Sequence, residues 1–173
     1  MAQVIAGDKN LYGELVKRYQ DKLYRYLFYL LYQHADRTAD AVQATFIKAY
    51  QNLNSYKPQY NFSTWIYRIA HNEAISLLRR EKHWLNTVDI DFAPELSDQQ
   101  DPIAKLAKEE TKLALWQALN QLKIKQKQAL LLFYIEGNSY ERIAEIMQTN
   151  KNNVASDIRR AKQKLAEILR EEK

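Results

Sequence analysis

The chain has 173 residues and a formal net charge of +5, and it holds only three glycines, three prolines and no cysteine. A chain this poor in glycine and proline can hardly make the many turns of sandwiches, barrels or glycine-loop nucleotide folds, so long helices are expected. The lack of cysteine excludes disulfides, thiolate metal sites and a cysteine nucleophile. No apolar run approaches the roughly 18 residues of a membrane span, and the first eight residues lack a signal-peptide pattern. We therefore expect a cytoplasmic all-α protein without membrane insertion.

Charge is divided unevenly along the chain. Residues 1–88 carry a net +5, residues 89–101 hold five acids and no base, and residues 102–173 carry a net +5. A mild excess of basic residues is common in soluble proteins. Two basic modules joined by an acidic spacer are more specific, and they suit a single polyanion such as a nucleic acid.

Apolar residues at helical spacing predict three helices in the first module, over about residues 9–33, 38–53 and 63–82. Asp36 or Thr38 is the expected N-cap of the second helix, and Ser63 is that of the third. The loop before the third helix contains Lys57-Pro58, a pair biased away from helix.

The rest of the chain is predicted to hold an extended acidic linker and four more helices. Residues 83–102 lose helical periodicity and contain two prolines, which is typical of a linker. The domains are then expected at 1–82 and 103–173. The helices of the second domain are predicted over about 103–121, 124–136, 139–147 and 151–170.

The last two predicted helices have helix-turn-helix spacing, with Asn150 as the N-cap of the second. The inward face of that helix is apolar, whereas the outward face can hydrogen-bond to base edges and phosphates. The alternative is a solvated basic face on a surface helix, and spacing alone supports both equally. The outward residues are Lys151, Asn152, Asn153, Ser156, Arg159, Arg160, Lys162, Gln163 and Lys164.

Aromatic residues gather in and after the loop of the first module, next to basic residues, as in proteins that stack unpaired bases. The rings of Trp65 and Tyr67 are expected in the core. Tyr56 and Tyr60 are harder to bury in a polar loop, so stacking is favoured for this pair. Asn72 and Ser76, one helical turn apart, could hold the edge of a flipped base, although a polar solvent face is the simpler interpretation.

The sequence offers almost no support for an enzyme. The three histidines have no metal-ligand spacing, and no nucleophile elbow, phosphate-binding glycine loop or paired carboxylates are present. We therefore expect no metal site, no cofactor and no small-molecule substrate.

Three stretches resemble the extracytoplasmic-function (ECF) group of the sigma-70 family of bacterial transcription initiation factors. Residues 40–50 (DAVQATFIKAY) and 62–72 (FSTWIYRIAHN), ending in Leu78-Arg79-Arg80, resemble two helices of sigma region two. Residues 136–147 (EGNSYERIAEIM), with Val154 and Arg160-Ala161-Lys162, resemble the region-four helix-turn-helix. The resemblance implies a region-two helical bundle and a region-four helix-turn-helix domain joined by the linker.

The resemblance also implies partners, namely core RNA polymerase, promoter DNA and an anti-sigma factor. In the family, a region-two helix docks on the β′ clamp of the polymerase, region two captures a flipped base of the −10 element, and region four reads the −35 element. The β subunit is a further expected contact, and the linker threads toward the active centre. The expected polymerase-binding residues are Asp40, Val42, Gln43 and Phe46, with Val42 and Phe46 expected to lie partly in the core. The expected −10 residues are Asn54, Ser55, Tyr56, Lys57, Tyr60, Trp65, Arg68, Asn72, Ser76 and Arg79. The expected −35 residues are Lys151, Asn152, Asn153, Ala155, Ser156, Arg159 and Arg160.

This chain departs from the family pattern at several positions. Ser76 stands where Asp or Asn is common, and Gln148 stands where the family usually has glycine.

Two other functions are considered, a stand-alone helix-turn-helix regulator and a single-strand-binding or scaffold protein with no polymerase role. The aromatic loop and the clamp-type helix favour the sigma factor over the stand-alone regulator, whereas co-elution with core polymerase would separate it from the single-strand-binding or scaffold protein.

Overall fold

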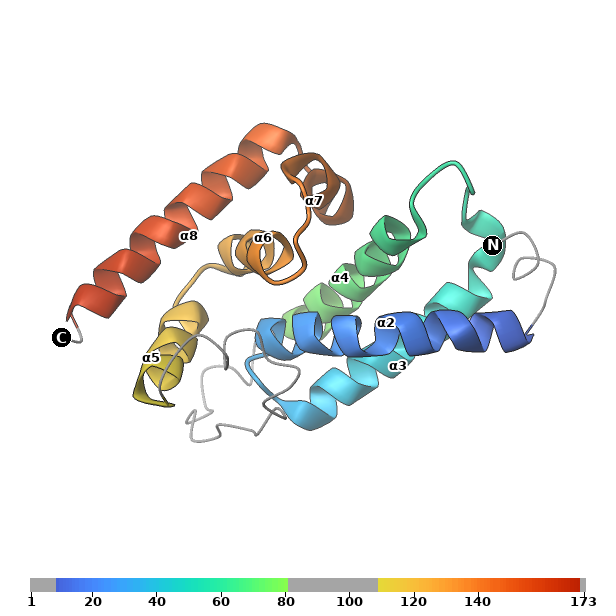
Figure 1. Ribbon diagram of the computed structural model, residues 1–173, viewed down its shortest axis with the longest axis horizontal. Helices are drawn as coiled ribbons and strands as arrows, with labels where there is room; N and C mark the ends of the chain where they lie inside the picture. The colour runs from blue at the N-terminus through green and yellow to red at the C-terminus, as the bar shows by residue number, and fades with distance from the viewer. Residues whose placement is uncertain (1–8, 81–108, 172–173) are drawn as a thin grey trace. The chain divides into compact units, whose positions relative to one another are not determined.

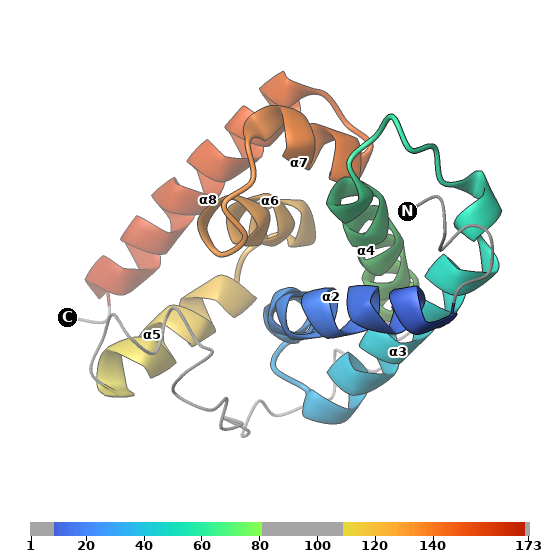
Figure 2. The same cartoon turned by 45° about the vertical axis from the view of Figure 1, so that its right-hand side comes forward.

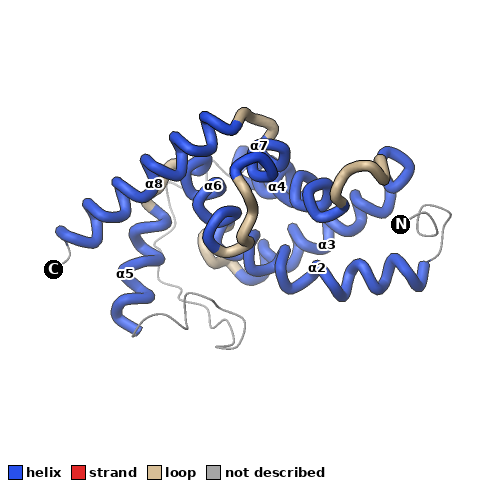
Figure 3. Tube along the Cα trace, turned by 45° about the horizontal axis from the view of Figure 1, so that its top comes forward, coloured by secondary structure: helices blue, strands red, loops and turns tan. Residues whose placement is uncertain are grey.

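The computed structural model describes residues 9–80 and 109–171, and all the regular elements in these two ranges are helices (Figures 1 and 3). The chain divides into two compact units, Met1–Phe92 and Ala93–Lys173. The all-α class and the two modules are thus confirmed. The predicted linker, residues 83–102, and the domain boundaries beside it lie outside the described residues.

The first unit is a bundle of three long helices (Figures 1 and 2). Each of the three packs against the other two. The second half of the first helix is almost entirely buried and forms the centre of the bundle, because aromatic and leucine side chains cover most of its circumference. The elements are α2 (Lys9–Leu30), α3 (Ala35–Gln51), the short 3-10 helix η1 (Leu53–Ser55) and α4 (Phe62–Arg80).

The connection between α2 and α3 differs from the prediction. The helix α2 ends at Leu30 rather than near residue 33, because Tyr32 and Gln33 adopt positive φ angles of 58° and 60° that stop the helix. The residue in the N-cap position of α3 is His34, so Asp36 and Thr38 are not caps. Thr38 instead lies inside the helix, where its hydroxyl donates to the backbone carbonyl of His34 at 2.7 Å.

The start of α4 also corrects a prediction. Asn61, not Ser63, caps this helix, because the Asn61 Oδ1 atom accepts a hydrogen bond from the backbone N–H of Ser63 at 3.0 Å. The helix therefore begins at Phe62. Its buried face includes Ile66, Ala70 and Ala74, as the apolar spacing predicts.

The second unit packs three helices against a long C-terminal helix. Val154, Ile158 and Ala161 are buried on the inner face of that last helix, which confirms its predicted orientation. Its predicted cap is also confirmed, because the Asn150 side chain accepts from the backbone N–H of Asn153 at 2.9 Å. The elements are α5 (Glu109–Asn120), α6 (Ile124–Tyr134), α7 (Tyr140–Met147) and α8 (Lys151–Glu171).

The turn between α7 and α8 is tight and strained at one residue. Ser139 caps the start of α7 by accepting from the backbone N–H of Arg142 at 3.3 Å. At the other end Gln148 adopts a left-handed conformation with φ of 52°. Glycine adopts this conformation without steric cost. Gln148, which stands where the resembled family usually has glycine, is therefore strained.

One charged residue lies inside the second unit. Lys127, on α6, is completely buried, and its Nζ atom donates to the Oδ1 atom of Asn120 at 2.7 Å. Burial favours the neutral amine and lowers the pKa of Lys127 to about 7.

Candidate nucleic-acid interface

A pocket of about 270 Å³ opens on the first unit between the C-terminal part of α3, η1 and α4. Its size is near the lower end of sites that hold small molecules, and it suits a single flat ring system. Four of the predicted −10 residues line it together, namely Ser55, Trp65, Arg68 and Asn72. The other lining residues are Lys48, Asn52, Ile69 and Glu73.

The rim of this pocket continues along one face of α4. Arg68, Asn72, Ser76 and Arg79 are all exposed, at spacings of four, four and three residues, so they form one polar stripe. The stripe has two guanidinium groups and two short hydrogen-bonding side chains. This combination can hold a phosphate backbone and the edge of a base.

Lys48 and Glu73 form an ion pair across the pocket, and sequence reasoning assigned neither of them to a site. The Nζ atom of Lys48 on α3 contacts the Oε1 atom of Glu73 on α4. The Glu73 side chain is only 10 % exposed, whereas that of Lys48 is 52 % exposed. Their sequence separation of 25 residues left no local signal to find the pair.

Tyr56 is buried, contrary to the prediction that this loop residue resists burial. It is 6 % exposed, and its ring packs against Phe62 and Trp65 with centroid distances of 5.6 and 5.3 Å. Its hydroxyl donates to the backbone carbonyl of Tyr60 at 2.7 Å. Burial raises the pKa of Tyr56. The physical reason is the aromatic cluster at the start of α4, which provides an apolar site for the ring while the loop backbone accepts a hydrogen bond from the hydroxyl.

Tyr60 is the exposed ring of this loop. It is 59 % exposed and is held in place through its backbone by Tyr56. Trp65 is 7 % exposed and Tyr67 is 4 % exposed, which confirms their predicted core positions. An exposed aromatic ring on a fixed loop can stack on an unpaired base, so Tyr60 is suited to the task predicted for the pair.

The outer face of α3 forms a second candidate surface. Asp40 and Gln43 are exposed, and they continue into Ile47 and Tyr50, which are 49 % and 42 % exposed. These four residues, spaced by three, four and three, are called the outer stripe of α3. Two large apolar side chains in one exposed stripe are typical of a protein-binding surface. Helical spacing in the sequence could have identified Ile47 and Tyr50, because they continue the stripe that starts at Asp40 and Gln43.

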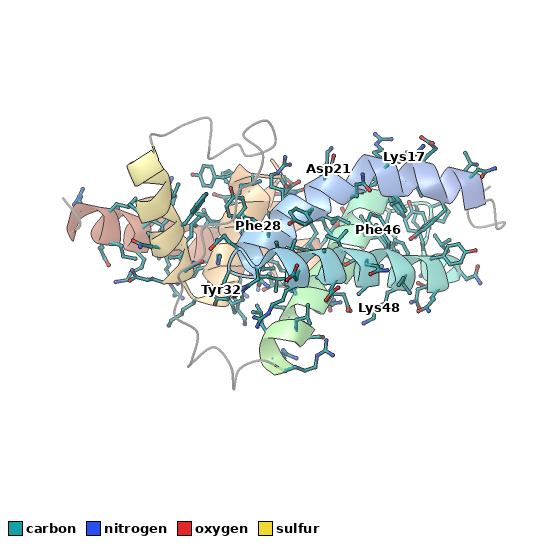
Figure 4. All side chains as sticks on the ribbon, turned by 90° about the horizontal axis from the view of Figure 1, so that it is seen from below. Lys17, Asp21, Phe28, Tyr32, Phe46 and Lys48 are labelled. Carbon is teal, nitrogen blue, oxygen red and sulfur yellow. The ribbon has the colours of Figure 1, made fainter. Side chains whose placement is uncertain are left out.

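The other two predicted polymerase-binding residues are less accessible, as expected for positions that belong partly to the core. Phe46 is 8 % exposed and belongs to the core. Its backbone carbonyl accepts a hydrogen bond from the hydroxyl of Tyr12 on α2 at 2.5 Å, so this turn of α3 lies against α2. Figure 4 shows Phe46 and Lys48 on different sides of α3, with Phe46 on the side of α2. Val42 is half-buried. Phe46 is therefore placed to support α3 from inside rather than to offer its ring to a partner.

The helix-turn-helix presents most of its predicted residues to solvent. Asn152, Asn153, Arg159 and Arg160 are exposed, while Ala155 and Ser156 are half-buried. Two of these predicted contacts already have partners within the motif. The Lys151 ammonium contacts Glu141 and lowers the pKa of that carboxyl to about 2, and the Asn153 Nδ2 atom donates to Thr149 Oγ1 at 2.9 Å.

Residues 9–80 and 109–171 contain no group of three or more potential metal ligands. None of the helices in the same ranges combines the length and apolar character needed to cross a bilayer.

Comparison with known proteins gives a consistent result in both units. The family described as Sigma-70 region 2 matches residues 15–83, and Sigma-70, region 4, matches residues 112–165. The chain is 34 % identical to the ECF RNA polymerase sigma-E factor of Haemophilus influenzae, over 93 % of this chain and 88 % of that protein. It is 32 % identical to the RNA polymerase sigma-H factor of Pseudomonas aeruginosa, over 96 % and 90 %. A solved structure of the sigma factor RpoE in complex with the anti-sigma factor NepR, from Bartonella quintana, superposes with a TM-score of 0.72 at 25 % identity, over 91 % of this chain and 96 % of that one.

Proposed function

Because the chain belongs to the ECF group of the sigma-70 family, we propose that it binds core RNA polymerase in the cytoplasm and directs it to promoters through the −10 and −35 elements. It acts by binding rather than by chemistry. The observation that carries the proposal is the pocket beside α4, where four predicted −10 residues meet around a space suited to one base.

Capture of a −10 base is proposed for this pocket and for Tyr60. The flipped base enters between Ser55 and Asn72 over the buried ring of Trp65, while Arg68 and Arg79 hold the backbone. Extrusion of a base costs a few kcal/mol. Stacking returns about 1–3 kcal/mol per base. The balance is close to zero, so the polymerase has to contribute to opening.

Docking on the polymerase is proposed for the outer stripe of α3. Asp40 and Gln43 supply polar contacts, and the exposed side chains of Ile47 and Tyr50 supply apolar area. Burial of two such side chains at an interface yields about 1.5–3 kcal/mol each as an upper range. The partner surface is the β′ clamp, with the β subunit as a further contact.

Recognition of the −35 element is proposed for the exposed face of α8. Arginine holds guanine with two hydrogen bonds, and asparagine holds adenine in the same way, so Arg159, Arg160 and Asn152 can specify sequence. The ammonium of Lys151 can exchange Glu141 for a DNA phosphate, because both partners are exposed and the pair is weak in water.

An anti-sigma partner is proposed by analogy with the solved complex of the Bartonella protein. Such a partner would hold the chain inactive by covering the outer stripe of α3 or the face of α8. The outer stripe of α3 carries exposed apolar groups at Ile47 and Tyr50, and the face of α8 carries exposed basic groups.

The decisive experiment is reconstitution of the purified chain with core polymerase. We expect co-elution of the two and run-off transcription from a subset of genomic fragments, which share sequence near −10 and −35. Co-elution without transcription would contradict promoter recognition. Binding of DNA without co-elution would favour a stand-alone helix-turn-helix regulator, an alternative that does not account for the region 2 match over residues 15–83.

A further inference from the structure

The pocket beside α4 contains a carboxylate, which is unusual for a surface that binds a polyanion. Glu73 lines this pocket with its side chain 10 % exposed, and Lys48 on α3 contacts its Oε1 atom. The Lys48 ammonium balances the charge of this carboxylate, so Glu73 acts in the pocket as a hydrogen-bond acceptor rather than as a net negative charge.

Resting on the proposed capture of a −10 base, we propose that Glu73 determines which base the pocket accepts, by receiving a hydrogen bond from an exocyclic amino group. Adenine, cytosine and guanine each carry such an amine, and carboxylates are known acceptors for the N4 amine of cytosine. Thymine has no such amine, and its one donor on that edge, the N3–H, lies between two carbonyl oxygens that a carboxylate repels. We therefore expect the pocket to disfavour thymine.

Glu73 has the hydrogen-bonding capacity for this role. A carboxylate offers about four acceptor positions, and the contact with Lys48 uses one of its oxygens. The neighbouring side chains cannot substitute for it as pure acceptors, since Lys48 and Arg68 are donors only and Asn72 is both donor and acceptor.

Lys48 has a positioning role in the same pocket. Its ammonium holds the carboxylate from the side of α3 and balances its charge, so that the strand can approach. Loss of Lys48 would weaken binding of every sequence, whereas loss of the Glu73 carboxylate would change the preference at one position.

The test measures binding of the holoenzyme to single-stranded −10 oligonucleotides, taken from a promoter that run-off transcription identifies and varied to all four bases at each position. Wild type, Glu73→Gln, Glu73→Leu, Lys48→Met and Glu14→Gln are compared by fluorescence anisotropy. Glu14→Gln is the matched control, because Glu14 also pairs with a lysine, at 3.1 Å, but lies on the exposed surface of α2 outside the pocket.

We expect wild type to disfavour thymine roughly ten-fold at one position, which is the value of one hydrogen bond to a charged group. Both Glu73 variants should reduce that discrimination below about two-fold at this position alone, and Glu14→Gln should leave it unchanged. Circular dichroism and core binding confirm that each variant folds, and Glu73→Gln keeps the test available if the leucine variant does not.

The inference fails if wild type tolerates thymine at every position, if both Glu73 variants keep the discrimination, or if they lose affinity equally at all positions. Each of these results leaves the proposed function intact. Failure of the wild-type holoenzyme to bind any −10 oligonucleotide selectively would instead contradict base capture itself.

Discussion

The buried lysine of the second unit gives a quantitative prediction. Lys127 is completely buried and its pKa is lowered to about 7, whereas an unfolded lysine titrates near 10.5. At a pH between these two pKa values, the unfolded chain binds about one proton more than the folded chain. The free energy of unfolding therefore rises with pH in this window, by about 1.4 kcal/mol per pH unit, and below pH 7 the full cost of burying the ammonium is present.

Replacement of Lys127 by methionine removes this titration. Methionine has a similar length and no charge, so Lys127→Met should stabilise the second unit relative to wild type at pH 6–7. The advantage should shrink by about 2–3 kcal/mol between pH 7 and pH 9. Loss of the hydrogen bond to Asn120 costs about 1 kcal/mol, and any difference in its strength between the ammonium and the amine is already contained in the pKa of Lys127.

Amide hydrogen exchange of α6 and α8 measures this effect within one unit, because exchange of buried helical amides reports local opening. Wild type and variant are compared at the same pH from 6 to 9, so that intrinsic exchange rates cancel. A difference that is constant across this range would refute the argument, since it would mean that Lys127 stays charged in the fold.

Three further predictions concern the turn, the loop and the outer stripe. Gln148→Gly should raise the free energy of unfolding by about 0.5–1 kcal/mol in urea titrations, because glycine relieves the left-handed strain; destabilisation would contradict this. Tyr60→Ala should weaken binding of a −10 single strand by about 1–3 kcal/mol, more than Tyr56→Phe does; equal losses would mean that the loop fold matters, not the exposed ring. Ile47→Asp should reduce core polymerase affinity at least about ten-fold with thermal stability nearly unchanged; unchanged affinity would remove the outer stripe from the interface.

Helical periodicity predicted most of the fold, because the core-facing residues of α4 and α8 repeat at the spacing of one helix face. The ends of helices were less predictable. His34 occupies the cap position instead of the expected Asp36 or Thr38, and Asn61 occupies it instead of Ser63, since the backbone of the preceding turn decides which residue can cap. Nothing in the local sequence indicated the positive φ angles at Tyr32 and Gln33.

The candidate site could be predicted only in part, because some of its contacts join segments that are distant in sequence. The polar stripe of α4 is local in sequence and was visible as helical spacing, whereas the Lys48–Glu73 pair joins two helices and depends on their packing. The burial of Tyr56 depends on Phe62 and Trp65, which reach it only once α4 has formed. Composition alone treated Tyr56 and Tyr60 alike, and the tertiary environment separated them.

The helix α3 carries groups for two tasks on two of its sides, so the number of residues between these groups determines how they are placed relative to each other. Gln43 on the outer stripe and Lys48 at the pocket are separated by five residues of continuous helix, a rise of about 7–8 Å and a rotation of about 500°. A rigid spacer of this kind sets where a captured base would lie relative to the protein that the outer stripe binds. A single residue inserted between Gln43 and Ile47 would turn the first half of the outer stripe by about 100° against Ile47, Tyr50 and Lys48, so we expect α3 to tolerate substitution far better than insertion.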